Sequence, residues 1–134
     1  MQSTLRIMEW NANGLLQHQQ ELQVILSTEK IDVCLISETH LTKHSHVRFN
    51  GYVVYHTIHP DNTARGGSAI IIKECIVHTE LAQYSTQEIQ ATAVEIRTDR
   101  YSFTIAGLYS PPRHGIKKEQ YLEYLNIMGT RLII

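Results

Sequence analysis

One short stretch, VCLISETHL at residues 33–41, limits the folds open to this chain more than any other. Residues 31–37 read IDVCLIS, an almost unbroken apolar run of strand length with Asp32 near its start. Such a run is typical of a strand buried on both faces, which requires a layer of structure on either side of it. The run ends in Glu38 rather than in a residue that turns the chain. We therefore expect a layered fold in which this strand delivers a carboxylate to a site.

The rest of the chain alternates between helical and strand-like patterns. Helices are predicted at 15–29 and 117–128, and the turn at 98–100 predicts a hairpin between the last two strands. Strands are predicted at 5–10, 31–37, 52–56, 68–73, 75–79, 89–97 and 101–109. The helix faces expected to be buried are Leu15, Leu16, Leu22, Ile25 and Leu26 in the first helix, and Tyr121, Leu122, Leu125 and Met128 in the second. This order predicts an α/β layered fold with mixed or largely antiparallel strand pairing.

Composition limits the class of protein. A chain of 134 residues with 43% apolar residues can form one domain with a core but not two. No apolar run approaches the roughly 20 residues that span a membrane, and the N-terminus lacks a signal-peptide pattern, so we expect neither a membrane protein nor a secreted one. The net charge of −1 means that any contact with phosphates would need a metal or a few placed cations. Cys34 and Cys75 are set among apolar residues and are expected to be buried thiols, with a disulfide as the alternative.

Three polar segments follow predicted strands, where layered α/β proteins place their sites. They are residues 10–14, 37–40 and 109–112, which contain Asn11, Glu38 and Tyr109 respectively. Carboxylate and amide oxygens are hard ligands that suit Mg²⁺ or Mn²⁺, and a tyrosine hydroxyl can donate to a phosphate oxygen.

Each of these residues also has an ordinary structural interpretation. Asn11 or Asn13 could be a turn or cap residue, Glu38 a solvated carboxylate, and Tyr109 an aromatic residue at an interface. None of them is specific on its own, and only their combination carries weight.

Three other patterns are weaker. The histidines at 40, 44, 46, 56 and 59 have neither cysteine partners nor an HExxH frame, which disfavours a zinc site. Gly66 and Gly67 enter a predicted strand without a following helix, so a backbone role is favoured over a phosphate loop. No serine lies in a GxSxG context, which disfavours acyl-transfer chemistry.

Four ordered blocks carry a family resemblance: WNANGL at 10–15, LISETHL at 35–41, RGGSAIIIK at 65–73 and YSPPR at 109–113. Together they resemble the endonuclease/exonuclease/phosphatase superfamily, and most closely the N-terminal endonuclease domain of jockey-type non-LTR retrotransposons. The resemblance implies a four-layered α/β sandwich that cleaves phosphodiesters with a divalent metal. Retrotransposon members nick double-stranded target DNA for integration and carry a reverse transcriptase domain downstream.

The resemblance also implies roles for single residues. Glu38 matches the metal-binding glutamate, Asn11 matches the asparagine beside the metal, and Tyr109 matches the tyrosine that contacts the scissile phosphate, with Mg²⁺ or Mn²⁺ as the cofactor. Arg113 and the Lys117–Lys118 pair have no firm counterpart, and we assign them to DNA-backbone contact, with solvated charge as the alternative.

Two later blocks of the family, GDxN and SDH, do not occur in the sequence. Residues 1–134 are therefore expected to form a single, C-terminally truncated domain, the N-terminal half to two-thirds of the fold. We expect this fragment to be inactive or a weak metal binder, and to act inside the cell, in the nucleus, through its parent protein. The alternatives are another phosphodiesterase or phosphatase on the same fold, or a non-catalytic remnant.

Overall fold

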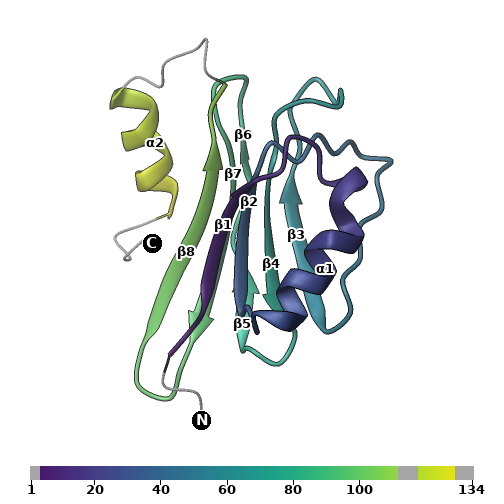
Figure 1. The fold of residues 1–134 in the computed structure, drawn as a ribbon. Coiled ribbons are helices and arrows are strands. Elements are labelled where there is room, and N and C mark those ends of the chain that lie inside the picture. The colour runs from purple at the N-terminus through teal and green to yellow at the C-terminus, as the bar shows by residue number, and fades with distance from the viewer. Residues whose placement is uncertain (1–3, 112–117, 129–134) are drawn as a thin grey trace.

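The computed structural model describes residues 4–111 and 118–128. In this part of the chain, two four-stranded sheets pack face to face, and one α-helix lies outside each of them (Figure 1). Neither helix is long and apolar enough to cross a membrane.

The first sheet is built around a parallel strand–helix–strand unit. Strand β1 (Ile7–Asn11) pairs in parallel with β2 (Val33–Ser37), and the chain between them forms a short 3-10 turn, η1 (Leu16–His18), and helix α1 (Gln19–Thr28). Antiparallel strands β4 (Ser68–Lys73) and β3 (Tyr52–Thr57) complete the order β1-β2-β4-β3. The apolar strand β2 thus lies inside the sheet, as its sequence predicts.

The second sheet is centred on β7 (Gln90–Arg97). Strand β8 (Ser102–Tyr109) pairs along the whole length of β7, which confirms the predicted hairpin. The short strands β5 (His78–Glu80) and β6 (Tyr84–Ser85) pair with the two ends of β7. Helix α2 (Lys118–Met128) follows.

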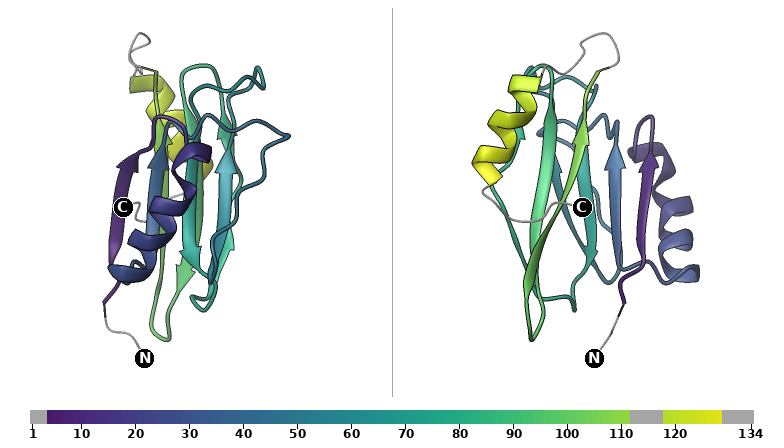
Figure 2. Two further views of the ribbon diagram at one scale, coloured as in Figure 1. Left: turned by 45° about the vertical axis from the view of Figure 1, so that its right-hand side comes forward. Right: turned by 90° about the vertical axis from the view of Figure 1, so that its left-hand side faces the viewer.

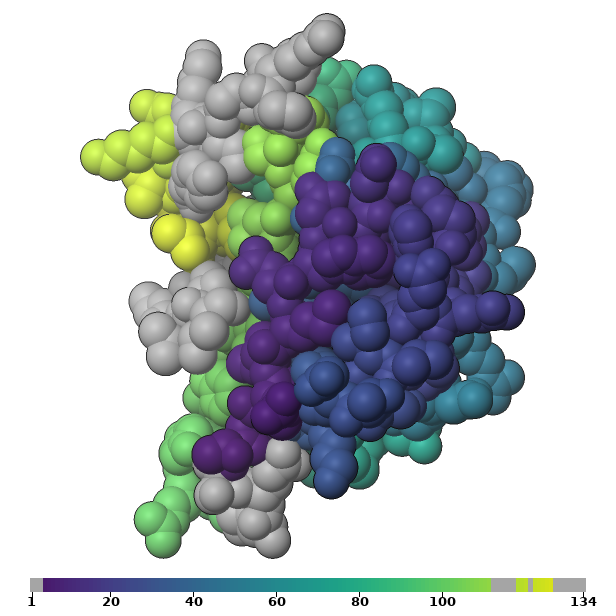
Figure 3. All heavy atoms as spheres, viewed as in Figure 1, coloured from purple at the N-terminus to yellow at the C-terminus, as the bar shows by residue number. Residues whose placement is uncertain are grey.

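Three buried clusters hold the layers together. Leu22 and Leu26 of α1 pack on the outer face of the first sheet, and α1 covers this face in the space-filling view (Figure 3). Isoleucines and valines of β2, β4, β7 and β8 fill the layer between the sheets. Tyr124 of α2 packs on the second sheet. The resulting order of helix, sheet, sheet and helix is the predicted four-layered α/β sandwich (Figure 2).

The predicted strand at 75–79 is wrong. The chain turns after Lys73, where the Ile76 amide donates to the Lys73 carbonyl over 3.1 Å, and strand pairing begins only at β5. The turn carries Cys75 to the surface, so the prediction of two buried thiols holds for Cys34 alone, and both cysteines are free. A short apolar pattern does not by itself distinguish a strand from a turn that carries apolar side chains.

The helix faces also differ in detail from the prediction. Leu15, Leu22 and Leu26 are buried, but Leu16 and Ile25 are exposed, because the sheet covers only the central stripe of the helix. In α2 the buried residue is Tyr124, whereas Leu122 and Leu125 are exposed; the side chains at 121 and 128 lie outside the described part. Tyr124 packs here because the underlying sheet presents small alanine side chains on which a ring fits.

Candidate active site

The carboxyl ends of β1 and β2 meet at one edge of the first sheet, because the strands are parallel and Asn11 lies opposite Ser37. The two segments stay paired beyond the strands. The Gly14 amide donates to the Glu38 carbonyl over 2.8 Å, and the Leu15 amide donates to the Thr39 carbonyl over 2.9 Å. The sequence-predicted residues Asn11 and Glu38 are thus brought to adjacent strand ends.

The backbone in this region is strained. Asn13, Glu38 and His40 have positive φ angles of 45°, 54° and 57°. Asparagine adopts this conformation readily, but glutamate and histidine do so at a cost of about 1 kcal/mol or more. Strain of this kind clusters at functional sites, where the surrounding structure holds it in place. Residues 38–40, which we call the Glu38 turn, are therefore a candidate site on backbone grounds as well as chemical ones.

Tyr109, at the end of β8, reaches the Glu38 turn from the other sheet. Its hydroxyl donates to Oε1 of Glu38 over 3.2 Å. Burial raises the pKa of Tyr109 above its ordinary value, and the negative charge of Glu38 and the hydrogen bond act in the same direction. The phenol therefore stays protonated at neutral pH and remains a hydrogen-bond donor.

Asn11 forms a turn interaction and can still offer an oxygen to a ligand, so both interpretations of this residue apply. Its Oδ1 accepts a hydrogen bond from the Asn13 amide over 3.1 Å, which is the expected turn interaction. The side chain is nevertheless exposed, and a carbonyl oxygen has a second lone pair. A structural role for Asn11 therefore does not prevent it from binding a ligand.

The double-glycine turn, Gly66–Gly67, lies against the Glu38 turn. The His40 amide donates to the Gly66 carbonyl over 2.9 Å, and the Thr39 amide donates to the Gly67 carbonyl over 3.4 Å. Both glycines have positive φ, and a Cβ on Gly67 would lie 2.4 Å from Oγ1 of the buried Thr39. This confirms the predicted backbone role of the two glycines. Their lack of a side chain lets the backbone of residues 66–67 approach the Glu38 turn closely.

Sequence reasoning missed Gln90 and included Thr39 in the polar segment 37–40 without giving it a role. Both are fully buried, and the Gln90 side chain accepts a hydrogen bond from the Gly67 amide over 3.0 Å. No spacing in the sequence signals this contact, because Gln90 lies 23 positions from Gly67 and belongs to the other sheet than β4, the strand that Gly67 precedes. The glutamine at the start of this strand is the only local hint.

The donors at this edge fit a hard divalent cation. Glu38 supplies a carboxylate and Asn11 an amide oxygen, which suit Mg²⁺ or Mn²⁺ with water completing the coordination shell. Within residues 4–111 and 118–128, no group of three or more histidine, cysteine or acidic side chains could hold a metal ion. The buried His59 instead lies 2.9 Å from Asp61, which also pairs with Arg65.

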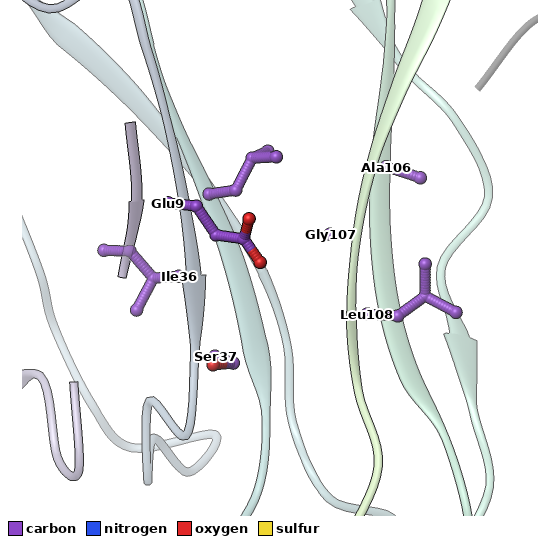
Figure 4. Close-up of a pocket in the computed structure, with 7 residues that line it drawn as sticks. Glu9, Ile36, Ser37, Ala106, Gly107 and Leu108 are labelled. Carbon is purple, nitrogen blue, oxygen red and sulfur yellow. The ribbon is translucent and has the colours of Figure 1, made fainter. Parts of the chain in front are cut away.

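A pocket of about 350 Å³ opens beside the strand ends, between β2 of one sheet and β8 of the other. Glu9 is the only charged residue in its lining, and its carboxylate points from β1 across the gap toward Gly107 (Figure 4). The outer edges of β1 and β8 are not paired with any strand in the described residues. The layer between the sheets is therefore open on this side of the site.

Two predicted contact residues, Arg113 and Lys117, lie outside the described residues. The neighbouring Lys118 is exposed at the start of α2.

Comparison with known proteins agrees with this geometry. Residues 8–132 match the Endonuclease/Exonuclease/phosphatase family. The chain is 36% identical over 132 residues to the RNA-directed DNA polymerase from mobile element jockey of Drosophila melanogaster, and 30% identical to that of Drosophila funebris. These matches cover 98% of this chain but 14% of each relative.

Solved structures show the same fold. The endonuclease domain of TRAS1, a telomere-specific non-LTR retrotransposon, superposes with a TM-score of 0.71 at 22% identity, covering 96% of this chain and 57% of that one. The AP endonuclease LMAP from Leishmania major gives a TM-score of 0.63 at 16% identity, covering 90% of this chain and 44% of that one.

Proposed function

Because the chain belongs to the endonuclease/exonuclease/phosphatase family, we propose that it is the N-terminal part of a divalent-metal-dependent DNA endonuclease of the non-LTR retrotransposon type. One observation carries the proposal. The Tyr109 hydroxyl and the Glu38 carboxylate, from different sheets, meet at 3.2 Å beside the strand end that bears Asn11. The names of the relatives, mobile-element polymerases and a retrotransposon endonuclease domain, support the choice of DNA as substrate.

Each residue has a distinct role in this proposal. Glu38 holds Mg²⁺ or Mn²⁺ through its carboxylate, with the Asn11 amide oxygen beside it. The bound metal supplies charge stabilisation for the phosphodiester. Tyr109, kept protonated by its surroundings, donates a hydrogen bond to a non-bridging oxygen of the scissile phosphate in place of its hydrogen bond to Glu38. Arg113 and Lys117 contact the DNA backbone.

The proposal extends to partners and place of action. Double-stranded DNA is the substrate, and the nick it receives serves integration. A reverse transcriptase domain belongs to the same polyprotein, and the reaction takes place in the nucleus. The jockey relatives support this, since they are named as polymerases of which the chain spans 14%.

We further propose that these 134 residues alone are inactive or nearly so. Their sequence contains neither GDxN nor SDH, and they span 57% of the solved TRAS1 endonuclease domain. Within the described residues, Tyr109 and Glu38 touch each other, but no group of three or more histidine, cysteine or acidic side chains gathers that could hold a metal and activate water. The open pocket between β2 and β8 supports the same proposal, because its apolar lining would be covered in a complete sandwich.

Two measurements on the 134-residue chain test these statements. Mn²⁺ binding, followed by electron paramagnetic resonance, should be detectable and should weaken at least tenfold in Glu38→Gln. Supercoiled plasmid should remain un-nicked in the presence of Mg²⁺. Binding that Glu38→Gln leaves unchanged would overturn the assigned metal site. If the 134-residue chain nicks the plasmid and Glu38→Ala does not, the proposed inactivity is overturned and the proposed endonuclease activity stands. Hydrolysis of a phosphomonoester without DNA nicking would favour a phosphatase.

A further inference from the structure

The Gln90 side chain is buried between the two sheets and hydrogen-bonded at both ends. Its Oε1 accepts from the Gly67 amide over 3.0 Å, and its Nε2 donates to the Thr86 carbonyl over 2.7 Å. Its exposed fraction is 0%. A buried carboxamide is costly unless both its acceptor and its donor are satisfied, so these two bonds hold its orientation firmly.

On one side, Gln90 acts on the Glu38 turn through the double-glycine turn. The amide that Gln90 accepts from belongs to Gly67, and the Gly66 and Gly67 carbonyls in turn accept from the His40 and Thr39 amides. These amides directly follow Glu38, whose φ of 54° is unfavourable for a glutamate. A continuous line of hydrogen bonds therefore runs from the Gln90 carboxamide to the strained backbone beside the Glu38 carboxylate.

On the other side, Gln90 is the strand partner of Tyr109. The two residues lie directly opposite each other in the ladder between β7 and β8. The space next to Gly66 is shared by both side chains, since a Cβ there would lie 2.5 Å from Gln90 Oε1 and 3.4 Å from Tyr109 Cε2. Gln90 is thus the strand partner of Tyr109 and is also hydrogen-bonded to the double-glycine turn that supports the Glu38 turn.

We propose that Gln90 is a positioning residue that sets the separation of the Glu38 carboxylate and the Tyr109 hydroxyl. The two groups come from different sheets. The buried Gln90 side chain accepts a hydrogen bond from Gly67, which supports the Glu38 turn, and Gln90 is also the strand partner of Tyr109. A carboxamide suits this position because it accepts from Gly67 and donates to Thr86 at the same time. The consequence for metal binding rests on the proposed function, but the effect on the Tyr109–Glu38 contact does not.

The test compares Gln90→Met with Thr92→Val. Methionine matches the length of glutamine and removes both hydrogen bonds. Thr92 is the next inward-facing residue of β7, equally buried, and bonds to Thr57 and Ser68 at 2.8 Å each, so its loss weakens the contact between the sheets without reaching the Glu38 turn. The Tyr109 ring is followed by NMR of tyrosine labelled with ¹³C at Cζ, with Tyr109→Phe identifying its signal.

We expect the Cζ chemical shift of Tyr109 to change in Gln90→Met, because the ring loses its fixed place beside Glu38, and to stay unchanged in Thr92→Val, although both variants lose stability. Mn²⁺ affinity should fall several-fold in Gln90→Met alone. If Gln90→Met fails to fold, Gly66→Ala carries the test, because its Cβ displaces the Gln90 oxygen, with Gly51→Ala as the control for positive φ. A Tyr109 signal that is the same in wild type and in Gln90→Met or Gly66→Ala would overturn the proposal. Absence of Glu38-dependent Mn²⁺ binding in wild type would count against the proposed function, and the NMR result would still decide the role of Gln90.

Discussion

The Tyr109 hydroxyl donates a hydrogen bond to Glu38 Oε1 over 3.2 Å, although the residues are 71 positions apart in the chain. Tyr109 ends the last strand of one sheet, and Glu38 follows the central apolar strand of the other. The contact can form only when the two sheets pack with their strand ends aligned. It is therefore both a reporter of the fold and the centre of the candidate site.

Removing the charge of Glu38 should make Tyr109 easier to ionise. The carboxylate opposes formation of the tyrosinate, so Glu38→Gln is expected to lower the pKa of Tyr109, which burial alone will still hold above its ordinary value. The measurement is the tyrosinate absorbance at 295 nm between pH 9 and 12, with Tyr109→Phe subtracted to isolate one phenol. An unchanged titration in Glu38→Gln would show that the two side chains do not interact in solution.

Gly67→Ala should destabilise the protein more than Gly51→Ala does. Both glycines have positive φ, 89° and 82°, so both substitutions carry a backbone cost of about 1 kcal/mol. Only at Gly67 does the new Cβ meet an atom within 3 Å, the Thr39 hydroxyl, whereas nothing lies within 4 Å at Gly51. Urea denaturation should therefore give the larger loss for Gly67→Ala. Adding Thr39→Ala should recover part of that loss, and strictly additive effects would argue against the close approach.

The free energy of unfolding should depend on the ion pair between the buried Asp32 carboxylate and Lys73. Lys73 Nζ lies 3.1 Å from Asp32 Oδ1, and the Arg6 amide donates to the other carboxylate oxygen over 2.7 Å. Lys73→Met removes the cation but leaves the carboxylate buried, which is expected to cost about 3 kcal/mol. The double variant Asp32→Asn/Lys73→Met should be more stable than Lys73→Met alone. Thermal melts of wild type, Lys73→Met and the double variant decide this, and a double variant no more stable than Lys73→Met would contradict it.

The two thiols should differ strongly in reactivity. Cys75 is exposed, while Cys34 is fully buried, and burial raises the pKa of the Cys34 thiol to about 12. Because the thiolate is the reactive form, one equivalent of thiol per chain is expected to react quickly with a disulfide reagent in the folded protein. The second should react only in denaturant. Fast reaction of two equivalents under native conditions, or of one in Cys75→Ala, would refute the burial of Cys34.

Stability should decline as the pH rises above 9. The pKa of Cys34 is raised from 9.0 to about 12, so the folded state holds its proton more tightly than the unfolded state does. This contribution is fully present below pH 9 and is lost as the pH rises toward 12, with a slope of at most about 1.4 kcal/mol per pH unit. Urea denaturation at pH 8, 9 and 10 measures the slope. Cys34→Ala should flatten it, and Cys75→Ala, at an exposed position, should not.

The sequence by itself determined most of the helices and strands and placed the candidate site residues at strand ends. The unbroken apolar run of β2 predicts a strand inside a layered fold, and the Glu38 that ends it is where the structure places its strained turn. These features are local, since periodicity and composition over a few residues are enough to produce them. The four sequence blocks added the family, which the comparison then confirmed.

The tertiary structure alone decided which residues meet. Gln90 has no pattern that marks it, yet its position opposite Tyr109 and beside Gly67 makes it part of the site. Cys75 and Cys34 look alike in sequence, and only the turn after β4 separates an exposed thiol from a buried one. Such outcomes depend on strand order and register between distant segments. Local side-chain patterns carry no information about them, because burial and contact are properties of the packed layers.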